Sequence, residues 1–117
     1  MLLSQPALKV SIHLNNDASS TEGFLCDAIL RFLQRSKIAG ATAFHAHAGF
    51  GSHHQLHTEG AGPVAGEHLP IVVSFIDDEE RVRAILPELL EMVTDGMVEA
   101  HPTQILKCAT AKPGVVS

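Results

Sequence analysis

The chain has 117 residues, of which 45% are hydrophobic and 18% charged, and its formal net charge at pH 7 is −5. This length fits one domain, residues 1–117, that buries a core of its own. The acidic balance and the absence of Trp and Tyr argue against a basic or base-stacking surface for nucleic acid. No apolar run reaches the roughly 18–20 residues of a membrane span and no signal peptide is evident, so we expect a cytoplasmic protein without direct membrane insertion.

The first predicted elements are a strand and a helix. The strand has the period of two expected of one buried face, with apolar residues at Leu8, Val10, Ile12 and Leu14. The helix that follows has Ser19 as its predicted N-cap, with Glu22 at capping-box spacing and Thr21 as a competing cap. Its predicted buried stripe contains Phe24, Leu25, Ala28, Ile29, Phe32 and Leu33. Gly40 is predicted to provide the positive φ of the turn after the helix.

The middle of the chain is predicted to contain a second strand at 41–47, a long loop at 48–68 and a third strand at 69–76. A loop of about 20 residues in a compact domain is usually functional. The third strand is almost continuously apolar, as a central strand is. Asp77 and Asp78 are predicted to cap a second helix, which Pro87 is predicted to kink or break.

Two short strands, at 97–100 and 103–109, are predicted to complete the domain, with Pro102 between them and a loose tail at 111–117. The order predicts an α+β fold, a ferredoxin-like βαββαβ sandwich in which two helices lie on one face of an antiparallel sheet, with a core from 8 to 109. Cys26 and Cys108 are predicted to be buried in a reducing cytoplasm.

Several segments, in this order and spacing, resemble the PII superfamily, and in particular its small PII-like branch of unknown function. They are Gly40-Ala41-Thr42, Gly49-Phe50-Gly51, His57-Thr58, Leu69 to Val73 followed by Asp77 to Glu80, and Leu86 to Val93 with Gly96. The resemblance implies a homotrimeric signalling protein that binds a small ligand in clefts between subunits. A flexible T-loop, 48–68 here, would report the ligand to a target protein such as a membrane transporter or channel.

The resemblance also implies a ligand, an adenine nucleotide, and by position the residues that would bind it. These are Thr42, Gly49, Phe50, Gly51, Ile76, Gly96 and Lys107. PII proteins have Arg-Gln after the GFG segment and two phosphate-facing arginines on the last strand. This chain has Ser52-His53 and only Lys107 there. Because Arg and Lys neutralise a triphosphate, AMP or ADP is expected ahead of ATP, and binding of no nucleotide stays open.

The alternative hypothesis is a metal-binding or metal-sensing trimer. Its ligands would be His45, His47, His53, His54 and His57, because neutral imidazole suits Zn, Cu or Ni. The spacing matches no established metal signature, and a structural zinc site normally recruits Cys, so solvated loop histidines explain the pattern better than a metal site does. An enzyme is the last choice, because the sequence shows no nucleophile–base pair, and we expect no catalytic residue.

Overall fold

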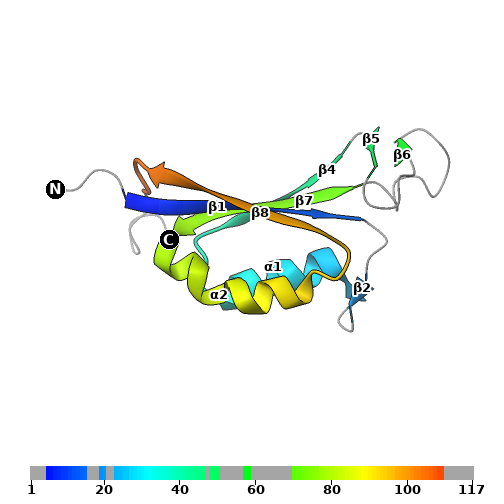
Figure 1. Ribbon diagram of the computed structural model, residues 1–117, viewed down its shortest axis with the longest axis horizontal. Coiled ribbons are helices and arrows are strands. Elements are labelled where there is room, and N and C mark those ends of the chain that lie inside the picture. Colours follow the sequence, from blue (N-terminus) through cyan, green and yellow to red (C-terminus); the bar gives the residue numbers. More distant parts are fainter. Residues whose placement is uncertain are drawn as a thin grey trace, which may run out of the picture.

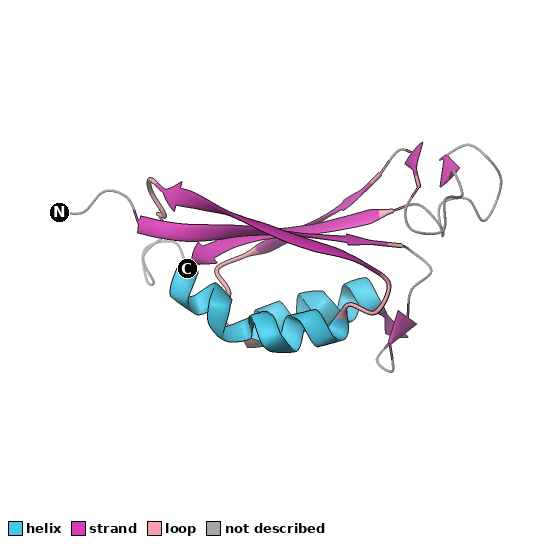
Figure 2. Ribbon diagram, in the orientation of Figure 1, coloured by secondary structure: helices cyan, strands magenta, loops and turns pink. Residues whose placement is uncertain are grey.

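The computed structural model describes residues 5–15, 19–20, 23–46, 48–50, 57–58 and 70–109. Two helices lie on one face of a four-stranded sheet (Figures 1 and 2). The elements in chain order are β1 (Gln5–Leu14), β2 (Ser19–Ser20), β3 (Gly23–Phe24), α1 (Leu25–Arg35), β4 (Ala41–His45), β5 (Ala48–Gly49), β6 (His57–Thr58), β7 (Ile71–Asp78), α2 (Glu79–Met92) and β8 (Gly96–Ile105). The predicted ferredoxin-like βαββαβ sandwich is confirmed. Neither helix within these residues is long and apolar enough to cross a membrane.

The order of strands in the main sheet is β4-β7-β1-β8, and each neighbouring pair is antiparallel. As a result, the start of β1 lies beside the ends of β7 and β8, where Gln5 pairs with Ile105 and Ala7 pairs with Asp78. The opposite end of the sheet holds Leu14, which pairs with both Ile71 and Gly96. These two ends carry different parts of the predicted site.

The core lies between the helices and one face of the sheet. Alternate residues of β1 and β7 point into it, and both helices present a buried stripe to the same layer. The side chains that are fully buried and largest are Ile12, Leu25, Ile29, Leu33, Leu89, Val10, Val73 and Val82. Burying a side chain of this kind stabilises a fold by roughly 1.5–3 kcal/mol, so this layer holds the sheet and helices together.

The predicted start of the first helix is wrong. Ser19 and Ser20 pair with Gly23 and Phe24 in a small hairpin, and the helix begins only at Leu25. The N-cap is therefore Phe24, whose backbone is extended and whose side chain makes no capping hydrogen bond. Because Phe24 precedes the first helical turn, it leaves the predicted stripe and is 63% exposed, while the other five members of the stripe are buried.

The turn after α1 also differs from the prediction. Lys37, rather than Gly40, has the positive φ, at 65°. The turn is closed by backbone hydrogen bonds from Lys37 N to Gln34 O (3.2 Å) and from Ile38 N to Leu33 O (3.2 Å). Ile38 follows directly and is buried. The chain therefore reverses direction at Lys37, three residues before Gly40, where the sequence predicts the turn. This reversal carries Lys37 to the end of the sheet where β7 and β8 end.

Neither internal proline breaks its element. α2 runs without a break through Pro87, and β8 is one strand that contains Pro102. β8 is an edge strand, where the missing N–H of a proline is tolerated because one side of the strand has no ladder to complete. β8 ends at Ile105, so the predicted strand at 103–109 is also too long.

The two cysteines are free and lie in different surroundings. Cys26 is half-buried in α1, and partial burial, followed by the charge of the neighbouring Asp27, raises the pKa of its thiol. Cys108 is exposed, contrary to the prediction, because the chain after Ile105 has left the sheet.

Candidate ligand groove

A groove of about 680 Å³ lies at the end of the sheet where β1 begins and β7 and β8 end. We call it the end groove and define it by six of its lining residues. They are Lys37, Ala39, Ile76, Asp77, Arg81 and Lys107. They come from the turn after α1, the end of β7, the first turns of α2 and the segment after β8. The groove therefore exists only in the folded chain, since the turn after α1, the junction of β7 with α2 and the segment after β8 are far apart in the sequence.

The end groove combines positive charge with an apolar surface. Lys37, Arg81 and Lys107 line it, and Asp77 and Asp78 are its carboxylates, which leaves one net positive charge in a chain whose total is −5. Ile76, 41% exposed, adds apolar surface to the groove. A site with apolar walls and a few placed cations suits a small molecule that has a ring and an anionic group.

Asp77 is the buried polar residue of this region, with 6% of its surface exposed. One carboxylate oxygen accepts a hydrogen bond from Ala39 N at 2.9 Å, and the other accepts from Asp78 N at 2.7 Å. Nε of Arg81 lies 3.7 Å from Oδ1 of Asp77. Asp77 therefore joins the end of β7, the turn after α1 and the start of α2. The predicted capping role is correct only in part, because Asp78 is the N-cap residue and makes no side-chain cap.

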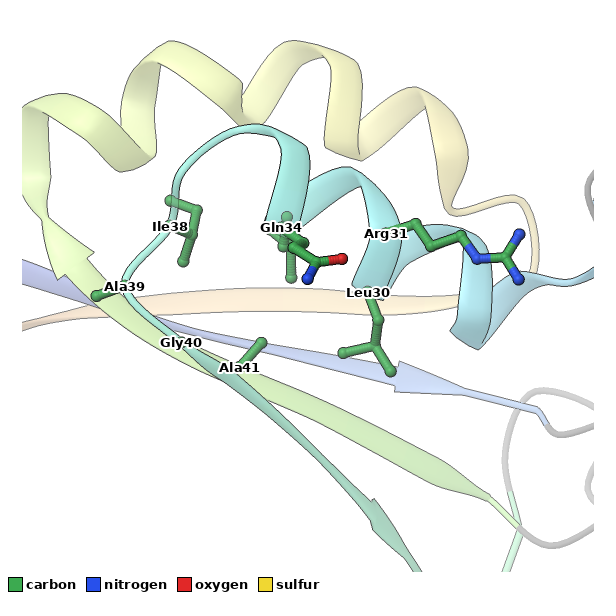
Figure 3. A pocket seen from close by; sticks show the side chains of 8 residues that line it. Leu30, Arg31, Gln34, Ile38, Ala39, Gly40 and Ala41 are labelled. Carbon is green, nitrogen blue, oxygen red and sulfur yellow. The ribbon is translucent and has the colours of Figure 1, made fainter. Parts of the chain in front are cut away.

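A second pocket, of about 390 Å³, lies between α1 and the edge strand β4 (Figure 3). Leu30 points from α1 toward the strand, and Arg31 is the one charged side chain among those lining the pocket. Its guanidinium is directed away from Ala39 and Gly40, toward the start of the helix. None of the residues that the resemblance implies to bind a ligand lines this pocket, so the end groove is the better candidate for a ligand site.

Among the predicted ligand-binding residues that the structure describes, Ile76 and Lys107 come together, both in the end groove. Thr42 is exposed on β4 opposite Ser74, partway along the sheet. Gly96 lies at the opposite end of the sheet, beside Leu14.

The remaining predicted residues belong to the loop after β4. Gly49 is in β5 and pairs with His57 of β6, and a Cβ at Gly49 would lie 3.3 Å from Cγ of Pro70. Phe50 is 62% exposed. Gly51 lies outside the described residues. The described part of the loop at 48–68 is thus not wholly irregular, since β5 and β6 form a short antiparallel pair within it.

The metal hypothesis falls largely on residues that the structure does not describe. His47, His53 and His54 lie outside the described residues, and only the backbone of His57 is described. His45 is exposed at the end of β4. Within the described residues, no group of three His, Cys, Asp or Glu side chains is arranged to hold a metal ion. The histidine site stays a prediction.

Sequence reasoning missed three residues of the groove, namely Lys37, Asp77 and Arg81. Arg81 is given no role by the sequence pattern, and Asp77 is predicted only as a helix cap. A signal for Asp77 was present, because the period of two in β7 that buries Val73 and Phe75 places Asp77 on the same buried face. A carboxylate at a core-facing position requires partners, and here those partners line a groove.

A family model matches residues 7–105, which include nearly all of the sheet and both helices. The family is DUF190, described as "Uncharacterized ACR". The chain belongs to the DUF190 family. The match begins in β1 and ends at the last residue of β8, so it includes most of the end groove.

This DUF190 chain is similar in fold to solved PII-like proteins. CPII, a nitrogen regulatory PII-like protein from Thiomonas intermedia K12 bound to ADP, AMP and bicarbonate, matches with a TM-score of 0.62 and 21% identity over 89% of this chain and 92% of its own. A candidate PII-like signaling protein from Thermus thermophilus matches with a TM-score of 0.57 and 23% identity over 89% and 91%. The apo form of CPII gives 0.58 and 17% over 87% and 94%. The PII-like resemblance is confirmed at the level of the fold.

Proposed function

We propose that this protein is a PII-like regulatory protein, not an enzyme, that binds an adenine nucleotide and reports it to a partner. The observation that carries the proposal is the end groove, in which Ile76 offers apolar surface beside the cations Lys37, Arg81 and Lys107. CPII, a protein of the same fold, is bound to ADP and AMP. AMP or ADP is expected ahead of ATP, since three cations opposed by two carboxylates neutralise a triphosphate only in part.

The proposed binding cleft is completed by a neighbouring subunit. Thr42, Gly49, Phe50 and Gly96 lie away from the end groove within one chain, so they complete the cleft only from a second subunit. No described residue covers the sheet face opposite the helices (Figure 1). Such a face favours association.

Exposed apolar side chains gather on this uncovered face. Phe44 lies opposite Val72 and is 56% exposed, and Met97 lies opposite His13 and is 59% exposed. Ile76 shares the face with Val72 on β7. We propose that the face is buried in a homotrimer.

Phe44→Glu is expected to shift the protein from a mass of about three times the 12.5 kDa chain to smaller species, because it places a charge in the proposed interface. Light scattering coupled to size-exclusion chromatography measures the mass. Phe24→Glu is the matched control, since Phe24 is also exposed, at 63%, but lies at the start of α1. If both variants keep the wild-type mass, the proposed interface is wrong.

The proposed signal passes through the T-loop at 48–68 to a partner protein in the cytoplasm, such as a membrane transporter or channel. This segment joins β4 to β7, the strand that ends in the groove, so it is connected directly to the sheet that would hold the ligand. The ligand would favour one arrangement of the loop through contacts that it makes only in that arrangement.

Calorimetric titration of the tag-free, metal-stripped protein with AMP, ADP and ATP tests the proposed ligand. We expect saturable binding near one nucleotide per subunit, with AMP or ADP binding more tightly than ATP. A parallel titration with Zn²⁺ tests the histidine alternative. Heat with Zn²⁺ and none with any nucleotide would move the function to the histidines, and no heat with either would reject both ligands.

A further inference from the structure

Arg81 connects α2 to the turn after α1. Its Nη1 donates a hydrogen bond to the Lys37 carbonyl oxygen at 2.9 Å, and its Nε lies 3.7 Å from Oδ1 of Asp77. The Arg81 side chain is 50% exposed and lines the end groove. A guanidinium has more N–H donors than these two contacts use, and they lie in one plane. Arg81 is thus held by the protein on one side while donors remain for a ligand on the other.

The carboxylate of Asp77 is not explained by core packing. Val73 and Phe75 precede it on the buried face of β7, and an apolar residue would continue that pattern. A buried carboxylate is unfavourable unless it is paired and hydrogen-bonded. Asp77 meets this condition through Ala39 N, Asp78 N and Arg81, and each of these contacts lies at the groove. The buried carboxylate of Asp77 therefore holds in place three residues that line the groove.

The turn that Asp77 and Arg81 hold is itself unusual. Lys37 has a φ of 65°, which is uncommon for a residue other than glycine, and its carbonyl is the one that Arg81 binds. Two residues on, Ala39 donates its backbone N–H to Asp77. The two contacts hold this turn, and with it Lys37, beside the groove.

We propose that Arg81 binds the phosphate group of the ligand in the end groove, and that Asp77 is the positioning residue that holds Arg81 in place. A planar guanidinium binds phosphate oxygens through two parallel hydrogen bonds, which a single ammonium does not do. Lys37 and Lys107 line the same groove and add positive charge. The inference rests on the proposed function, because it names the residues through which that site recognises its ligand.

Titration of the full chain with ADP, and separately with inorganic pyrophosphate, tests the role of Arg81. Arg81→Gln keeps a polar side chain but removes the charge and the planar fork. We expect it to weaken ADP binding at least about tenfold, the scale of one lost charge-assisted hydrogen bond. Arg81→Lys, which keeps the charge, is expected to lose less.

Arg83→Gln is the matched control for Arg81→Gln. Arg83 lies two residues further along α2, is 62% exposed and pairs with Glu79 at 2.9 Å, and it does not line the end groove. The variant has the same change in net charge, and we expect its affinity for ADP to stay within about twofold of wild type. Thermal unfolding of each variant shows that it is folded.

The role of Asp77 is tested by a double-mutant cycle. Asp77→Asn keeps an oxygen for Ala39 N and removes the charge that faces Arg81. We expect it to weaken ADP binding about threefold or more in the wild type and to have no further effect in Arg81→Gln, because its effect passes through Arg81. A merely structural role would weaken binding equally in both backgrounds, and that result would overturn the positioning role.

The two ligands separate failure of this inference from failure of the proposed function. If the wild type binds ADP and Arg81→Gln binds it equally well, or Arg83→Gln weakens it as much, the inference is overturned while the proposed function stands. If the wild type binds pyrophosphate through Arg81 but no nucleotide, the inference stands and the proposed function fails. If it binds neither, both are overturned.

Discussion

Leu89→Ala is expected to lower the free energy of unfolding by about 2–5 kcal/mol, whereas Leu90→Ala lowers it by less than about 1 kcal/mol. The two leucines are neighbours in α2, but Leu89 is 0% exposed and Leu90 is 50% exposed. The change in helix propensity is the same for both, so the difference reports the packing of the buried side chain. Removing the Leu89 side chain would leave a cavity between α2 and the sheet.

Equilibrium unfolding in urea, followed by far-UV circular dichroism, measures this difference. The chain contains no Trp or Tyr, so intrinsic fluorescence is a poor probe. Both variants and the wild type are compared at one protein concentration, because the stability of an oligomer depends on concentration. Equal losses in the two variants would mean that α2 presents a different face to the sheet than the one described.

The periodic parts of the fold could be predicted from the sequence. Alternation in β1 and the apolar stripe of α1 each require burial on one side, and this requirement fixes which residues face the core. Ile12 and Ile29 are two such residues, and both are fully buried. The sandwich follows because two apolar helix faces and one apolar sheet face are buried from water when they pack together.

The local signals at the ends of elements were less reliable. Ser19 and Glu22 have the spacing of a capping box, but Ser19 pairs in a short hairpin with Phe24 and the helix starts later. Gly40 could adopt a positive φ, but Lys37 does so instead, because the turn must bury Ile38. A local preference of about 1 kcal/mol is overridden by the burial of a large apolar side chain, which stabilises the fold by roughly 1.5–3 kcal/mol.

The residues of the candidate site also differ in whether the sequence could predict them. Ile76 and Lys107 were predicted from the resemblance, and the fold brings both into the end groove. Lys37 and Arg81 could not be assigned from sequence, because nothing in the spacing of a turn and a helix start indicates that the Arg81 guanidinium reaches the Lys37 carbonyl. Of Lys37, Asp77 and Arg81, only Asp77 carries a signal in the sequence, because it is a carboxylate at a core-facing position.

Gly96→Ala and Gly40→Ala are expected to change stability in opposite directions. A Cβ at Gly96 would overlap the backbone carbonyl oxygen of His13 and lie 3.3 Å from its carbonyl carbon, so β8 would have to move away from β1 at Leu14. We expect a loss of about 2–3 kcal/mol in urea unfolding. Gly40 has nothing within 4 Å of such a Cβ and no positive φ, so alanine there is expected to add about 0.4–1 kcal/mol by restricting the unfolded chain. If Gly96→Ala were as stable as wild type, close approach to β1 would not explain the glycine, and its predicted role in ligand binding would be the remaining explanation.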